Sequence, residues 1–96
     1  MIIIPISNNS RTLAERIASA YPTATILAYK DFSASTFQTA KQLVFIGALG
    51  ICVRTIAPFA TDKHTDPAVV CIDSTGRFVI SVLSGHIGGA NELARD

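Results

Sequence analysis

Three short apolar runs constrain the fold of this chain more than any other feature. Each run lacks the apolar–polar alternation of a half-exposed strand and ends at polar or glycine residues. Such a run predicts a strand that is covered on both faces, as in parallel sheets flanked by helices. The three runs are Met1–Ile6 (MIIIPI), Leu43–Ile46 (LVFI) and Ala68–Ile72 (AVVCI).

Two further strands and four helices are expected between and after these runs. The turn sequence DSTG at 73–76 predicts a hairpin that joins Ala68–Ile72 to a strand at Arg77–Leu83. A short strand is expected at Thr25–Ala28. The expected helices run from a cap at Ser10 to Tyr21, over Ser35–Lys41, from the Gly47–Gly50 turn to Pro58, and from Ala90 onward.

This alternation predicts a small layered α/β domain, with a mixed, mostly parallel sheet of about five strands flanked by helices. The chain has 96 residues, so we expect a single domain over residues 1–96.

Composition excludes several classes of protein. The net charge is +1 and no basic cluster occurs, so nucleic acid and anionic membranes are not expected partners. The apolar start is too short for a membrane span, which favours a cytoplasmic protein without a membrane partner. Cys52 and Cys71 lie in apolar runs without metal-ligand spacing, so buried, unreactive thiols are favoured over a disulfide or a nucleophile, and no metal site is expected.

The sequence LSGHIGGANELA at 83–94 is the first candidate for chemistry. It places Gly85, Gly88 and Gly89 around His86 between an expected strand and an expected helix. Backbone N–H groups there would favour an anion, His86 could act as a general base, and Ser84 adds a hydroxyl. Alternatively, the glycines only turn the chain and His86 packs. The spacing matches neither a nucleotide phosphate loop nor a serine nucleophile elbow.

A second candidate is GALGICVRTIAP at 47–58, where Gly50 lies in a turn and Arg54 interrupts an apolar helix. A guanidinium there could bind a ligand carboxylate, or it could pair with Asp62 or Asp66 on the surface.

The third candidate is TDKHTDP at 61–67. Lys63 and His64 could face a polyanion, or the segment could be a solvated loop in which Asp66 caps before Pro67. If the third and fifth strands run in the same direction, the turns after them fall at one edge of the sheet. That edge would suit a ligand with several carboxylates or phosphates.

The second half of the chain resembles a known family. The patterns GxxxRxIAP, DKxxDPAVVxxD and GRFVISxLSGHxGGANELA are similar to the N-terminal part of the CbiG proteins of cobalamin biosynthesis, the cobalt-precorrin-5A hydrolases. The first forty residues match only as a strand–helix opening.

The resemblance implies an activity in anaerobic corrin-ring synthesis. It implies that the δ-lactone of a cobalt-tetrapyrrole intermediate is opened and that a two-carbon fragment leaves as acetaldehyde. The substrate carries acetate and propionate groups and its own cobalt, so no protein cofactor is implied. Catalytic roles are expected for His86 and Ser84. Substrate-binding roles are expected for Gly50, Arg54, Lys63, His64, Gly85, Gly88, Gly89 and Asn91.

Family members are usually much longer, so this chain is expected to correspond to their N-terminal domain, without the middle and C-terminal parts. A second hypothesis is therefore a non-catalytic tetrapyrrole-binding or subunit-contact module that needs those parts for activity. Other enzymes of the pathway are conceivable partners. The short last helix is expected to be either frayed or held by a second copy of the chain, as a homodimer.

Overall fold

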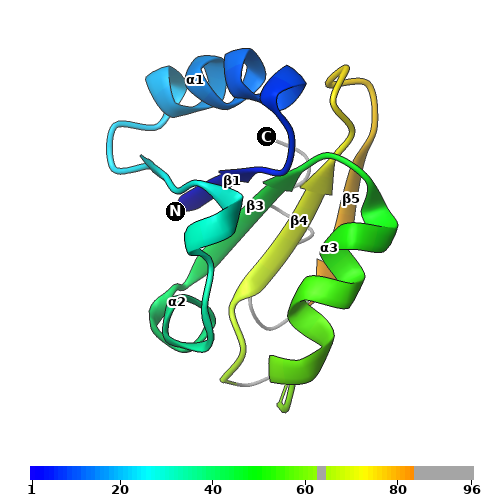
Figure 1. Ribbon diagram of the computed structural model, residues 1–96. Coiled ribbons are helices and arrows are strands. Elements are labelled where there is room, and N and C mark those ends of the chain that lie inside the picture. Colours follow the sequence, from blue (N-terminus) through cyan, green and yellow to red (C-terminus); the bar gives the residue numbers. More distant parts are fainter. Residues whose placement is uncertain (63–64, 84–96) are drawn as a thin grey trace.

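Parallel strands form most of the central sheet. The computed structural model describes residues 1–62 and 65–83 (Figure 1). The strands lie in the order β2-β1-β3-β4-β5, and every neighbouring pair is parallel except β4 and β5. Their bounds are β1 Ile2–Pro5, β2 Thr25–Ile26, β3 Gln42–Ile46, β4 Ala68–Ile72 and β5 Val79–Leu83. The expected mixed, mostly parallel sheet is confirmed.

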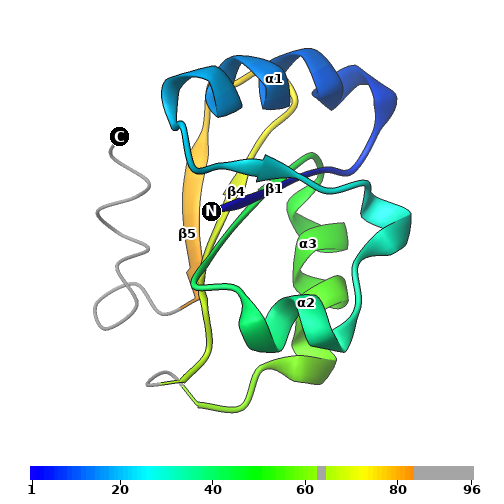
Figure 2. The ribbon, with the colours of Figure 1, turned by 90° about the vertical axis from the view of Figure 1, so that its left-hand side faces the viewer.

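Helices cover both faces of the sheet. The α-helices are α1 Arg11–Ala20, α2 Ala34–Thr39 and α3 Leu49–Ile56, and the short 3₁₀ helices are η1 Asn8–Ser10, η2 Tyr29–Asp31 and η3 Ala57–Phe59. Figure 2 shows α2 and α3 together on one side and α1 apart from them. The connection β1–α1–β2 leads toward one end of the strand order, and β3–α3–β4 leads toward the other end. Because both crossovers have the same handedness, their helices lie on opposite faces of the sheet. In the described ranges, no helix has the length and apolar character needed to cross a bilayer.

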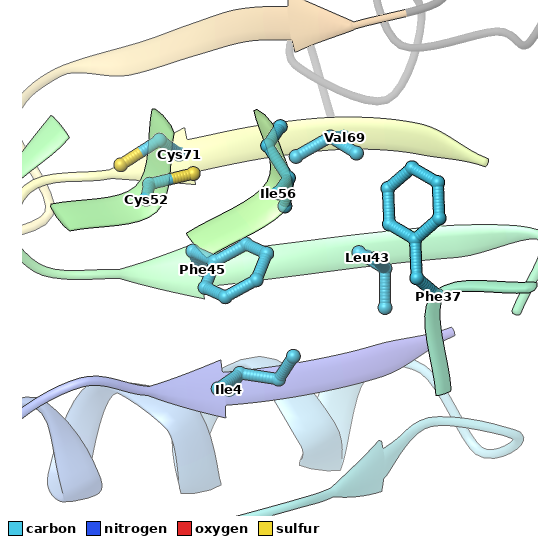
Figure 3. Close-up of a cluster of buried hydrophobic side chains, with 8 residues drawn as sticks. All are labelled: Ile4, Phe37, Leu43, Phe45, Cys52, Ile56, Val69 and Cys71. Carbon is cyan, nitrogen blue, oxygen red and sulfur yellow. The ribbon is translucent and has the colours of Figure 1, made fainter. Parts of the chain in front are cut away.

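The core has two layers because successive strand residues point to opposite faces. On the α2/α3 face, Leu43 and Phe45 pack with residues of both helices (Figure 3). On the α1 face, Val44 and Ile46 pack with the apolar stripe of α1. The buried members of the first layer are Ile4, Phe37, Leu43, Phe45, Cys52, Ile56, Val69 and Cys71, those of the second are Ile3, Ala14, Val44 and Ile46, and Ala68 and Val70 form a separate small cluster.

Three expectations about single elements need correction. The second strand covers only Thr25–Ile26, not Thr25–Ala28. Helix α3 begins at Leu49, so Gly50 belongs to its first turn and not to the loop before it. Ser10 occupies the N-cap position of α1, but its side chain makes no capping hydrogen bond to the helix. It is buried and its hydroxyl lies 3.2 Å from that of Ser7.

The direction of β5 corrects an expectation about the site. β3 is parallel to β4 and β5 is antiparallel to β4, so β3 and β5 run in opposite directions. Ile46 pairs with Ile72 at one edge of the sheet, whereas Leu83 pairs with Val69 near the other. The turns after these two strands therefore do not begin at a common edge.

Candidate functional site

Gly47 directly follows β3 and contacts the ends of β1 and β4, where the parallel strands end. Its φ is +147°, and a Cβ at this position would lie 2.9 Å from the Ile6 Cβ. The Gly47 N–H donates to the Ile72 carbonyl (2.8 Å), and the Ile6 N–H donates to the Ile46 carbonyl (2.9 Å). Because only glycine tolerates this backbone and this contact, Gly47 fixes the position of Ile6.

The strand order reverses between β1 and β3. From β1 the chain proceeds outward to β2, whereas from β3 it proceeds to β4 on the other side. In open α/β sheets, ligands bind at such a switch point, outside the carboxyl ends of the strands. We call the segments that follow β1, β2 and β3, namely 6–10, 27–31 and 47–50, the carboxyl edge.

Two adjoining cavities open at the carboxyl edge, and Ile6 and Tyr29 line both. The α3-side cavity has a volume of about 560 Å³ and is also lined by Ile51, Arg54 and Thr55. The α1-side cavity has a volume of about 470 Å³ and is also lined by Ser7, Asn8, Arg11 and Lys30. Both volumes are in the range of small-molecule sites, although both cavities are broadly open to solvent.

A hydrogen bond holds Tyr29 between the two cavities. The Tyr29 hydroxyl lies 2.9 Å from the Thr55 hydroxyl. Thr55 donates its own hydrogen to the Ile51 carbonyl (2.7 Å), so the Tyr29 hydroxyl is the donor to Thr55. This contact joins η2 to α3 and places the ring as a shared wall.

Three cationic side chains line these cavities. The Arg54 guanidinium lies over Gly50: a Cβ at Gly50 would be 3.8 Å from one of its terminal nitrogens. Arg11 is 3.9 Å from the Glu15 carboxylate, in an exposed pair one helical turn apart. Such exposed pairs are weak. Within residues 1–62 and 65–83, Arg54 and Lys30 take part in no ion pair.

Of the expected site residues, the structure describes only Gly50 and Arg54, which it brings together on one face of α3. Arg54 is exposed, and no ion pair between it and Asp62 or Asp66 is formed. The other expected residues lie outside the described residues: Lys63, His64, Ser84, Gly85, His86, Gly88, Gly89 and Asn91. The expected last helix, with its fraying or pairing, lies outside them too.

The interpretation of Asp66 as a capping residue is confirmed. Its carboxylate accepts hydrogen bonds from the backbone N–H groups of Thr61 (2.8 Å) and Asp62 (3.1 Å), just before the buried Pro67. These bonds organise the loop that leads into β4.

Both cysteines are free and buried, as expected. Figure 3 shows their side chains next to each other between α3 and β4. A hydrogen bond with Cys71 and burial raise the pKa of the Cys52 thiol. Cys52 therefore stays protonated at neutral pH, which argues against a nucleophilic role.

Sequence reasoning missed Arg11, Tyr29 and Lys30. Each has the ordinary appearance of an exposed residue at the start of a helix or in a loop. Only the parallel pairing of β2 with β1 and of β1 with β3 brings these segments to the side of α3.

Comparison with known proteins supports a single family. The family described as cobalamin synthesis G N-terminal matches residues 31–96. A cobalt-precorrin-5A hydrolase of Priestia megaterium is 63% identical over 62 residues, which cover 65% of this chain and 17% of the relative. The enzyme of the same name from Salmonella typhimurium is 54% identical over 67 residues, covering 70% of this chain and 19% of the relative. The matched segment thus spans less than a fifth of the length of these curated relatives.

A solved structure extends the match to the first thirty residues. It is described as a cobalamin biosynthesis protein G homologue from Sulfolobus solfataricus, and it superposes with a TM-score of 0.89 at 33% identity. The match covers 98% of this chain and 32% of that chain, so the sheet and helices described above are shared almost completely. With its sequence motifs and its fold both in agreement, the chain belongs to the cobalamin synthesis G N-terminal family.

Proposed function

We propose that this chain is the N-terminal domain of a cobalt-precorrin-5A hydrolase. The observation that carries the proposal is the identity of 63% and 54% to two enzymes of that name. The family match, over residues 31–96, includes all three motifs found in the sequence.

The proposed reaction is the opening of a lactone on a cobalt tetrapyrrole. Water adds to the lactone carbonyl, and the bond between the acyl carbon and the ring oxygen breaks. A carboxylate forms, and the oxygen stays on the two-carbon fragment. Its hydroxyl then loses a proton as the carbon–carbon bond to the macrocycle breaks, the bonding electron pair passes into the conjugated macrocycle, which is reprotonated, and the fragment leaves as acetaldehyde. The cobalt arrives with the substrate, so the proposal assigns no cofactor to the protein.

The motif at 83–94 supplies the proposed catalytic groups. His86 accepts a proton from the attacking water, Ser84 assists, and backbone N–H groups near Gly88 and Gly89 hold the developing oxyanion. Arg54, Lys63 and His64 are proposed to bind substrate carboxylates, with Gly50, Gly85 and Asn91 beside the ligand. These roles rest on residue chemistry and on the resemblance.

The proposal is tested by incubating the chain with cobalt-precorrin-5A and measuring acetaldehyde through an NADH-coupled alcohol dehydrogenase. Wild type should release acetaldehyde, and His86→Ala should lower kcat about a hundredfold or more, as loss of a general base does. The matched control is His64→Ala, which should raise KM and leave kcat nearly unchanged. Equal kcat for wild type and His86→Ala would remove His86 from the mechanism.

A second candidate function is a non-catalytic module that binds the tetrapyrrole or contacts another subunit. The observation in its favour is that the chain spans only 17% and 19% of its curated relatives. Tight binding of a corrinoid without acetaldehyde release would favour this candidate, whereas turnover by the chain alone would eliminate it.

A further inference from the structure

We propose that the two cavities at the carboxyl edge form one bipartite carboxylate site, which holds two acidic side arms of the same tetrapyrrole. One arm would bind Arg54 in the α3-side cavity, and the other would bind Arg11 and Lys30 in the α1-side cavity. The identity of the ligand rests on the proposed function, whereas the location and the charge of the site rest on the structure.

The first argument is the grouping of charge. Arg11, Lys30 and Arg54 come from three different elements, α1, η2 and α3, yet line two cavities that share Ile6 and Tyr29. None of the described residues that line either cavity is acidic. The carboxylate of Glu15 pairs with Arg11 through a long and exposed contact. A group of cationic side chains attracts an anionic ligand.

The second argument is the apolar wall between the cations. Ile6, Ile51 and Tyr29 line the α3-side cavity, where Arg54 and Thr55 are the other lining residues in the described part of the chain. Free phosphate has no apolar surface with which to contact these side chains. An acetate or propionate arm on a flat macrocycle combines a carboxylate for the guanidinium with carbon surface for the ring and the aliphatic side chains.

The third argument is the space above Gly50. Gly50 is exposed, and the Arg54 guanidinium lies back over it at van der Waals distance. The absence of a side chain at Gly50 leaves space beside the two terminal nitrogens of the guanidinium, the groups that bind carboxylates. The spacing of four residues between Gly50 and Arg54 gives both residues the same helix face.

Titration with uroporphyrin, a porphyrin with eight carboxylates, tests the site by the change in its absorbance. Arg54→Gln, and Arg11→Gln combined with Lys30→Gln, should each weaken binding about three- to tenfold, because exposed charge-assisted bonds are partly screened. Arg16→Gln is the matched control for Arg54→Gln, since it removes one charge from the exposed face of α1 outside both cavities. It should change affinity less than twofold. Glu15→Gln should strengthen binding slightly, because it frees Arg11.

Ligand variants separate the sources of the anion. Coproporphyrin, with four carboxylates, should bind more weakly than uroporphyrin, and inorganic phosphate should compete with neither at millimolar concentration. Equal losses in Arg54→Gln and Arg16→Gln would show an effect of net charge alone and would overturn the site, as would an absence of uroporphyrin binding or displacement by phosphate. Thermal unfolding of each variant confirms that the fold is retained.

The outcomes distinguish this site from the proposed function. If the chain releases acetaldehyde but substitution of Arg11, Lys30 and Arg54 leaves its porphyrin affinity unchanged, the site is overturned and the hydrolase is supported. Porphyrin affinity that depends on these residues, without acetaldehyde release, would support the site and favour the binding module.

Discussion

Among single residues, Gly47 is the most constrained by its surroundings. A Cβ there would meet the Ile6 Cβ at 2.9 Å, and its φ of +147° is unfavourable for other residues. We expect Gly47→Ala to lower the free energy of unfolding by roughly 1–3 kcal/mol, the usual range for such backbone strain. Denaturation with urea measures the difference.

Gly50→Ala is the matched control for Gly47→Ala. Gly50 is helical, and a Cβ there would meet nothing closer than the Arg54 guanidinium at 3.8 Å. Alanine should therefore raise the free energy of unfolding by about 0.5 kcal/mol through its helix propensity. Equal effects of the two substitutions would contradict the account of Gly47.

Asp73 gives the hairpin turn a pH dependence. Its carboxylate accepts hydrogen bonds from the Thr75 hydroxyl and from the Phe78 N–H (2.7 Å). The Thr75 bond first, and then the Phe78 bond, lower the pKa of Asp73 below its ordinary value. The stabilisation is therefore fully present above about pH 4, the ordinary aspartate value, and is lost as the pH falls through the lowered pKa.

Melting temperatures between pH 5 and pH 2 test this expectation. The wild type should lose stability on acidification more steeply than Asp73→Asn, and Thr75→Val should fall between the two because it keeps the carboxylate but removes a donor. Parallel curves for wild type and Asp73→Asn would show that the turn does not contribute to the acid response.

At the scale of elements, the hydrogen bond from the Tyr29 hydroxyl to the Thr55 hydroxyl links η2 to α3. A double-mutant cycle with Tyr29→Phe and Thr55→Val should give a coupling of roughly 0.5 kcal/mol, the low end expected for an exposed hydrogen bond. Thr39→Val is the control, because Thr39 bonds only within α2, to Ser35. Tyr29→Phe and Thr39→Val should be additive, and similar coupling in both cycles would refute the link.

The strands and helices could be predicted because their signals are local. Apolar runs without alternation became β1, β3 and β4, and the stripe that includes Leu13 and Ile17 became the inner face of α1. The second strand was overestimated because only Thr25 and Ile26 pair with β1, while Leu27 retains a single hydrogen bond to Ile3.

The arrangement of the site depends on pairing between distant segments, and this could not be predicted as well. The DSTG hairpin requires β5 to oppose β4, which already conflicts with a common edge for the turns after β3 and β5. Arg54 was found because a charge in an apolar helix is conspicuous. Arg11 and Lys30 were not, because exposed cations are ordinary until the strand order places them beside a cavity.

At the scale of the whole molecule, the cations gather at one place and exposed apolar side chains at two. The three cations line cavities at the switch point between β1 and β3. Tyr29, Leu49 and Val53 are exposed near these cavities, whereas the other exposed large apolar side chains, Phe78, Val79 and Ile80, lie at β5, at the far end of the strand order. A small ligand and a protein surface could therefore be bound without competition between them.

Phe78, Val79 and Ile80 should cause the isolated chain to associate with a second copy. Their exposed fractions are 66%, 41% and 42%. Phe78 directly precedes β5 and Val79 and Ile80 begin it, and β5 pairs with β4 alone among the described strands. Exposed apolar side chains on an outer strand favour pairing with another chain.

We expect the sedimentation coefficient to rise with protein concentration in the wild type. It should remain that of a monomer in the double variant Phe78→Ser/Ile80→Thr, which keeps a β-branched residue in the strand. Val53→Thr, at an apolar position of α3 with 43% exposure, is the control and should still associate. A wild type that stays monomeric at every concentration, or a Val53→Thr variant that dissociates equally, would show that β5 is not the contact surface.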